Sequence, residues 1–145
     1  MAGKLTWNGD RFLAEVTQEN IKAMNKAAIT VQATAMKLIG GAGSGRLYKR
    51  GKKSHRASAP GDPPARDTGI LTNSISFEVV QRGNEIKGFV GPDIDKIRSQ
   101  SPRTDPDYGW MLDQGTKNIA RRPWLRPSLI KSRNQILKFF KVANK

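Results

Sequence analysis

The sequence contains no cysteine and a single histidine, His55. The first absence excludes disulfides, thiolate metal sites and cysteine nucleophiles. A lone histidine without a second histidine or a cysteine also argues against a zinc centre, so we expect His55 to be an exposed loop residue. No run of apolar residues approaches the roughly 20 that a membrane-spanning helix needs, and no apolar signal segment begins the chain. We therefore expect no membrane contact and synthesis in a reducing cytoplasm.

Acidic residues are scarce, with 12 Asp and Glu against 26 Lys and Arg, a formal net charge of +14. Such an excess predicts attraction to polyanions, nucleic acid first, although an evenly basic soluble surface is the alternative. The charge is unevenly spread, because residues 41–56 contain no acid and neither does the chain from residue 114 onward. The first basic zone supplies our predicted nucleic-acid or partner contacts, which are Arg46, Lys49, Arg50, Lys52, Lys53 and Arg56.

Motifs for catalysis are also missing. There is no Gly-x-Ser-x-Gly elbow, and the glycines near residue 43 lack the Gly-Lys-Ser/Thr ending of a phosphate-binding loop. Four aspartates, Asp93, Asp95, Asp105 and Asp107, could be imagined as a magnesium cluster of a nuclease. They lie in a proline-rich loop, where Asp more often begins turns, whereas two-metal sites need acids on rigid elements. We expect no enzyme, no cofactor and no metal.

The length and the apolar periodicity predict one α+β domain over residues 1–145. Asn8 or Asp10 can cap a first helix that begins near Arg11, runs for about 28 residues and ends at Gly40-Gly41. A helix this long indicates that part of its stripe meets a neighbouring subunit, the alternative being an ordinary core helix. The expected stripe is Leu13, Ile21, Met24, Ala28, Val31, Ala35 and Leu38.

Residues 40–66 are rich in Gly, Ser, Pro and basic side chains and show almost no apolar periodicity. This composition predicts a long flexible loop without secondary structure, of which we expect residues 41–58 to become ordered on assembly when a partner arrives. Residues 70–80 alternate apolar and polar side chains, turn chemistry follows at 82–84, and the alternation resumes from 85. That pattern predicts an antiparallel β-hairpin.

The last part of the chain predicts two more helices. A short one, capped by Asp105, starts at Pro106 and ends at Gly115, which fits a left-handed closing position. The final helix starts near Pro127, and Arg133 falls inside its apolar arc. A buried unpaired Arg is costly, so Arg133 must reach the edge of the stripe or meet a carboxylate, its own or a neighbour's. The stripe consists of Leu129, Ile130, Ile136, Leu137 and Phe140.

Four short motifs follow one another in order: "APGDPPARDTGILTNSI" (59–75), "VGPD" (90–93), "YGWMLDQGT" (108–116) and "RRPWLRPSL" (121–129). Together they resemble the small head–tail connector, or neck and tail-completion, proteins of long-tailed double-stranded DNA phages. The resemblance covers about residues 59–140. Two positions depart from the family pattern: Asp113 stands where Glu is frequent, and Thr72 stands where a basic residue is common.

The resemblance implies an α+β structural subunit of the virion neck, at the head–tail junction, that catalyses no reaction. It implies a ring, compatible with a hexamer or a dodecamer, that touches adjoining neck, portal-adaptor or tail-terminator rings. Double-stranded DNA would pass through the lumen without being read in sequence. In this view Trp124 fills the core and the arginines beside it face a partner. The motif or interface residues are Thr68, Gly69, Leu71, Tyr108, Asp113, Gly115, Thr116, Arg122, Pro123, Trp124, Leu125, Arg126 and Pro127.

Two other functions stay open at this point. The chain could be a free accessory protein that binds nucleic acid independently of sequence, although it lacks a short helix-turn-helix pair. The metal-dependent nuclease is the third hypothesis.

Overall fold

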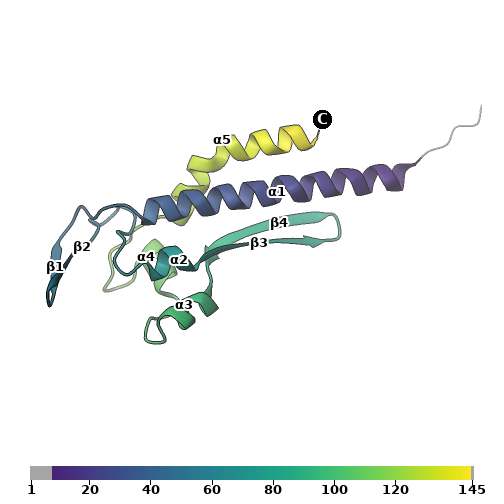
Figure 1. The fold of residues 1–145 in the computed structure, drawn as a ribbon. Coiled ribbons are helices and arrows are strands. Elements are labelled where there is room, and N and C mark those ends of the chain that lie inside the picture. Colours follow the sequence, from purple (N-terminus) through teal and green to yellow (C-terminus); the bar gives the residue numbers. More distant parts are fainter. Residues whose placement is uncertain (1–7, 145) are drawn as a thin grey trace, which may run out of the picture.

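A computed structural model describes residues 8–144. The molecule is α+β, and its long first helix forms a spine with the last helix along one side and a β-hairpin along another (Figure 1). A second, smaller hairpin projects beyond the C-terminal end of that spine (Figure 1). The elements in chain order are α1 (Gly9–Ile39), β1 (Leu47–Arg50), β2 (Lys53–Arg56), α2 (Ile70–Ser74), β3 (Ile75–Arg82), β4 (Glu85–Pro92), α3 (Ile94–Gln100), α4 (Tyr108–Gln114) and α5 (Leu125–Ala143).

Helix α1 confirms the predicted first helix and extends it to 31 residues. It starts at Gly9, the Asn8 side chain makes no capping bond, and Asp10 lies in the first turn, where the helix dipole favours an acid. The buried ridge contains mostly small side chains, which allow α5 and the β3–β4 hairpin to approach closely. Leu13, expected in the stripe, is 62% exposed. The buried residues are Ala23, Ala27, Ala28, Val31, Ala35 and Ile39.

Strands β3 and β4 form the predicted antiparallel hairpin, in a register that pairs Ile75 with Pro92 and Arg82 with Glu85. The prediction was wrong for residues 70–74, which form the short helix α2 instead of the start of the first strand. The two-residue turn between them begins with Gly83, whose φ of 59° is in the left-handed region that glycine enters without strain. The hairpin lies on α1, and Gln32 Nε2 donates a hydrogen bond of 2.8 Å to the Ile75 carbonyl.

The basic segment 40–66 is not structureless, and the prediction was wrong for its middle part. Strands β1 and β2 pair antiparallel around a two-residue turn that begins at Gly51, with a φ of 61°. All four β1 residues are exposed, so no buried face exists to impose the apolar alternation by which a strand is recognised. At the base a Cβ on Gly43 would lie 1.8 Å from the Arg56 carbonyl oxygen, so only glycine fits there.

The core lies where α1, α2, α4 and the start of α5 meet. Trp124 is fully buried at its centre, as expected, together with Ala35, Ile39, Leu71, Ile75 and Leu112. Helix α4 starts at Tyr108 instead of Pro106, and Asp105 Oδ1 accepts the Asp107 backbone N–H at 2.9 Å just before it.

Helix α5 starts at Leu125, two residues before Pro127, and its predicted stripe is only partly correct. Ser128 and Ser132 are the side chains that α5 buries, and Ser132 Oγ donates to Thr34 Oγ1 on α1 at 3.0 Å. Their small size lets the two helix backbones come close, which leaves the larger side chains outside. Leu129, Ile130 and Leu137 are therefore 54%, 61% and 47% exposed. None of the helices within residues 8–144 is both long enough and apolar enough to span a membrane.

Candidate nucleic-acid and subunit interface

The basic arm, residues 46–56, is the hairpin that projects from the C-terminal end of α1 (Figure 1). The β1–β2 register places Leu47, Lys49, Ser54 and Arg56 on one face and Tyr48, Arg50, Lys53 and His55 on the other. Lys52 is in the turn. All six predicted contact residues lie on the arm and all are exposed: Arg46, Lys49, Arg50, Lys52, Lys53 and Arg56.

An aromatic ring lies among these cations. The Arg46 guanidinium is 5.4 Å from the centroid of the Tyr48 ring, a cation–π contact, and Tyr48 is 46% exposed. Exposed cations beside an exposed ring can hold phosphates and stack on a base or sugar without reading sequence. Sequence reasoning did not single out Tyr48, although an aromatic residue inside a basic, acid-free run was a usable signal.

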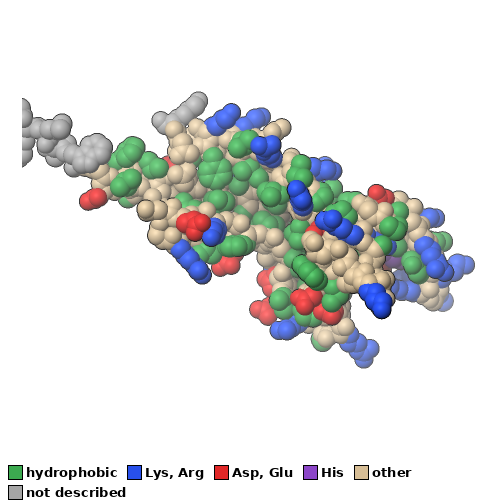
Figure 2. Space-filling view, turned by 180° about the vertical axis from the view of Figure 1, so that it is seen from behind, with side chains coloured by type: hydrophobic (Ala, Val, Ile, Leu, Met, Phe, Trp, Pro, Cys, Tyr) green, Lys and Arg blue, Asp and Glu red, His purple; other side chains and the backbone are tan. Residues whose placement is uncertain are grey.

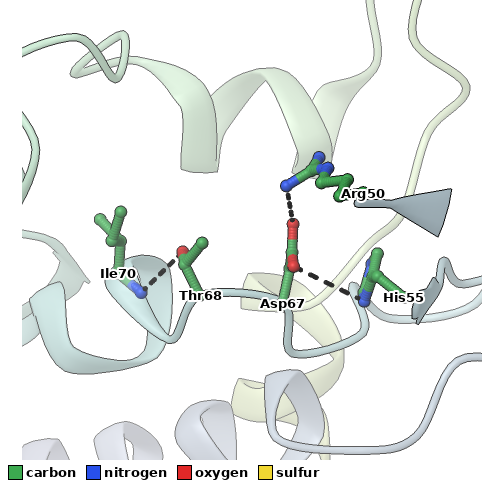
Figure 3. A network of polar contacts seen from close by, with 5 residues as sticks. All are labelled: Arg50, His55, Asp67, Thr68 and Ile70. Carbon is green, nitrogen blue, oxygen red and sulfur yellow. Dashed lines mark hydrogen bonds and ion pairs between the residues drawn. The ribbon is translucent and has the colours of Figure 1, made fainter. Parts of the chain in front are cut away.

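Asp67 ties the arm to the body (Figure 3). Its Oδ2 accepts a 2.8 Å hydrogen bond from Arg50 Nη1, and its Oδ1 lies 3.8 Å from His55 Nδ1. The His55 side chain is only 19% exposed, so the expectation of an exposed loop residue was wrong. The Arg50 side chain is 67% exposed, and such ion pairs contribute about 0–1 kcal/mol. The tie therefore orients the arm more than it stabilises the fold.

Between the arm and the body lies an open cavity of about 340 Å³. Arg50, Asp67, Thr72 and Tyr108 are among the residues that line it. Burial of the Tyr108 hydroxyl, assisted by the negative charge of Asp67, raises the pKa of this phenol above its ordinary value of 10.0. Thr72 Oγ1 is buried and has no hydrogen-bond partner among the described residues.

Asp113 holds the N-terminus of α5. Its carboxylate is buried, and Oδ1 accepts the backbone N–H groups of Trp124 at 2.8 Å and Leu125 at 3.0 Å. Oδ2 accepts a 2.6 Å bond from Gln114 Nε2. Trp124, the capping residue by position, has no side-chain capping bond, so Asp113 replaces the missing cap from a different helix. The Asp-x-Gly-Thr motif is therefore a structural joint between α4 and α5.

Gly109 completes that joint. The Trp124 Nε1–H donates to the Gly109 carbonyl at 3.1 Å. A Cβ at position 109 would lie 2.7 Å from Leu71 Cδ1 and 2.7 Å from Pro92 Cγ, so glycine lets α4 approach α2 and β4. All four motifs of the sequence thus meet at one packing point, and sequence reasoning missed Gly109 because nothing local in "YGWM" marks it.

The turns around the joint use the predicted glycines. Gly69 precedes α2 with a φ of 82°, close to Thr68, whose Oγ1 accepts the Ile70 N–H at 3.4 Å. Gly115 ends α4 with a positive φ of 78° but an extended ψ of 164°, so it closes the helix without the left-handed helical conformation. Thr116 Oγ1 accepts the Ile119 N–H at 3.1 Å and closes the reversal that follows.

Two of the arginines that were expected to face a partner are bonded within the chain. Arg121 Nε donates to the Asp113 carbonyl at 3.0 Å. Arg122 Nε and Nη2 donate to the Ser58 carbonyl at 3.3 and 3.2 Å, which fastens the segment that follows the arm. Both arginines therefore satisfy carbonyls of connecting loops, which need donors. Arg126 is exposed, and Pro123 and Pro127 are half-buried on either side of α5's start.

The proline-rich segment 92–107 was predicted to be a loop, but residues 94–100 form helix α3. Two of its aspartates, Asp93 and Asp105, accept hydrogen bonds from the backbone. Asp93 Oδ1 accepts the N–H groups of Asp95 and Lys96 at 3.0 and 3.2 Å and caps α3, which is the turn chemistry that we predicted. Within residues 8–144 no cluster of three or more His, Asp or Glu side chains is placed to hold a metal ion.

Comparison of the chain with protein-family models, curated proteins and solved structures found no match. The physical features that bear on function are the basic arm, the cavity at its root and the exposed apolar side chains of α1 and α5.

Proposed function

We propose that this chain is a ring-forming connector subunit of a long-tailed DNA phage, which joins head to tail around the DNA. The proposal rests on the ordered motifs between residues 59 and 129 and on the surface chemistry of the subunit. The motif residues Asp113, Trp124 and Gly109 form the joint that fixes α5 to the body, a structural role that a passive connector needs.

The basic arm is the observation that carries the proposal. Six exposed cations lie on a hairpin that projects from the body and contains no acid. A channel wall around DNA needs positive charge to attract the phosphates. It needs no groups that read bases, because DNA of any sequence must pass. The Asp67 tie holds the arm in one direction relative to the core, so a ring of subunits would present the cations in register.

The direct test is assembly. Particles made without this protein should contain filled heads and complete tails that fail to join. Complementation with the variant Lys49→Gln/Lys52→Gln/Lys53→Gln should join heads and tails poorly, since the lumen loses charge. The matched control removes the same charge from exposed sites elsewhere, Lys26→Gln/Lys37→Gln/Arg98→Gln, and should restore joining fully. Stable joining in the absence of the protein would refute the assignment.

A free nucleic-acid-binding accessory protein is the second candidate, and the exposed Tyr48 ring beside Arg46 favours it. It predicts that the isolated subunit retards DNA tightly and that binding weakens steeply with salt. The arm variant should then reduce the slope of the logarithm of the binding constant against the logarithm of the salt concentration by about two to three. The control variant with three substitutions should leave this slope unchanged. Negligible retardation at low salt would dismiss this candidate and leave the connector standing.

A further inference from the structure

An apolar groove of about 500 Å³ runs between α1, β4 and α5. Met24, Ala28 and Val31 line its α1 side, where Gly88 of β4 passes so close that a Cβ would lie 2.9 Å from Met24 Sδ. The remaining walls come from Phe89 and Val90 of β4 and from Leu125, Leu129, Ile136 and Phe140 of α5. Phe89 and Leu129 are 55% and 54% exposed, so a large apolar surface is open to solvent.

The N-terminal turns of α1 carry a second apolar surface. They extend beyond the tip of the β3–β4 hairpin and beyond the end of α5 (Figure 1). Phe12 and Leu13 are 60% and 62% exposed, and with Val16 they continue the helix face that further along packs in the core. Figure 2 shows apolar side chains both on this projecting end and over the middle of α1. The knob, residues 12, 13 and 16, has no covering element within the described chain.

Charges mark the two surfaces with opposite signs. Around the knob residues 9–22 contain three acids, Asp10, Glu15 and Glu19, against two bases, Arg11 and Lys22. Glu15 pairs with Arg11 and Glu19 with Lys22, whereas Asp10 forms no ion pair among the described residues. Around the groove, Arg126 and Arg133 lie on the same face of α5, which is bordered by Leu129 on one side and Ile130 on the other. Both arginines are exposed. Among the described residues neither forms an ion pair. Because both guanidinium groups are exposed, they are available to pair with carboxylates of a second subunit.

We infer that the knob of one subunit docks into the groove of a second copy, with its acids beside Arg126 and Arg133 of that copy. Knob and groove are different patches of one molecule, so the contact is heterologous. It can repeat from copy to copy instead of closing as a two-fold dimer. The groove accepts a helix laid across α5 and β4, and burial of the knob and groove side chains supplies the driving force. The inference deepens the proposed ring, and its biological setting rests on that function.

The absence of cysteine gives a clean background for trapping this contact. One subunit carries only Leu13→Cys in the knob, and its partner carries only Leu129→Cys in the groove. The two are mixed in equal amounts in a glutathione redox buffer, and disulfide-linked dimers are identified by mass spectrometry. The matched control replaces the groove cysteine by Ser99→Cys, an exposed site on α3. Thermal unfolding of each variant verifies that these exposed substitutions leave the fold intact.

The 13–129 heterodimer should exceed the 13–99 control by about tenfold or more, because docking raises the effective concentration of the two thiols. Arg126→Glu/Arg133→Glu in the groove subunit should lower the yield to the control level, and Asp10→Lys/Glu19→Lys in the knob subunit should restore it. Lys131→Glu/Lys138→Glu, the same charge change on the opposite face of α5, should leave the yield unchanged. Equal yields of the 13–129 and 13–99 dimers would overturn the inference, and so would a predominance of 13–13 and 129–129 dimers.

This experiment separates the contact from the function. If the cross-link fails while heads and tails still depend on the protein for joining, the connector stands and this contact is wrong. If the cross-link forms while heads and tails join without the protein, the contact stands and the connector is wrong.

Discussion

Replacement of Asp113 by Ala should destabilise the subunit by about 2–4 kcal/mol. The carboxylate accepts the N–H groups of Trp124 and Leu125, and each buried N–H left without a partner costs about 1–3 kcal/mol. Loss of a helix cap by itself costs about 0.5–2 kcal/mol, which reaches only the lower limit of that range, because here one side chain satisfies two N–H groups. Since the free energy of unfolding of a small domain is about 5–15 kcal/mol, this change is a large part of the stability.

Urea unfolding followed by Trp fluorescence measures this effect. With an m-value of about 1–3 kcal/mol per molar urea, the midpoint should fall by about 1–2 M. Asp113→Asn keeps a carbonyl oxygen as acceptor and should cost about 1 kcal/mol, the difference between a charged and a neutral acceptor. Asp107→Ala is the matched control, because its exposed side chain makes no capping bond and its loss should cost no more than about 0.5 kcal/mol. Equal midpoints for Asp113→Ala and Asp107→Ala would refute the reasoning.

Three further outcomes follow from the same geometry. Gly109→Ala should cost about 1–3 kcal/mol by overpacking against neighbouring side chains, whereas Gly91→Ala, with nothing within 4 Å of the added methyl, should be neutral; equal unfolding midpoints would contradict this. The difference in phenolate absorbance between the wild type and Tyr108→Phe reports the ionisation of Tyr108. Its midpoint should lie above pH 10.0, because burial favours the neutral phenol, and a midpoint below that value would contradict the prediction. Asp67→Asn should speed amide exchange in the arm while the global free energy of unfolding changes by less than about 1 kcal/mol, and unchanged arm exchange would show that the tie does not orient it.

Local patterns were enough to predict α1, the β3–β4 hairpin and the α+β class. Each of these elements has one buried and one exposed face, so apolar side chains recur along its sequence with the period of the helix or strand. The β1–β2 hairpin escaped prediction because all of its strand residues except His55 are exposed. The packing of α5 through Ser128 and Ser132 escaped for the opposite reason, since burial of small polar side chains gives no hydrophobic signal.

The roles of the site residues were harder to predict than the elements that carry them. Asp113 was predicted as a motif or interface residue, but its partners lie 11 and 12 positions further along the chain. Arg122 was expected to face a partner, and its Nε donates a hydrogen bond to the Ser58 carbonyl, 64 positions away. Such bonds depend on which loops the fold brings together, and no spacing rule within one segment encodes that.

The arrangement of the two functional surfaces limits how a ring could be built. The basic arm follows the C-terminal end of α1 and the knob lies at its N-terminal end (Figure 1). A helix of 31 residues separates them by about 45 Å at 1.5 Å per residue. If DNA binds at the arm and a neighbouring subunit at the knob, as proposed, the two would not compete for space, and surface charges this far apart are screened from one another at physiological salt. The acids around the knob can consequently serve a protein contact without weakening the attraction of the arm for phosphates.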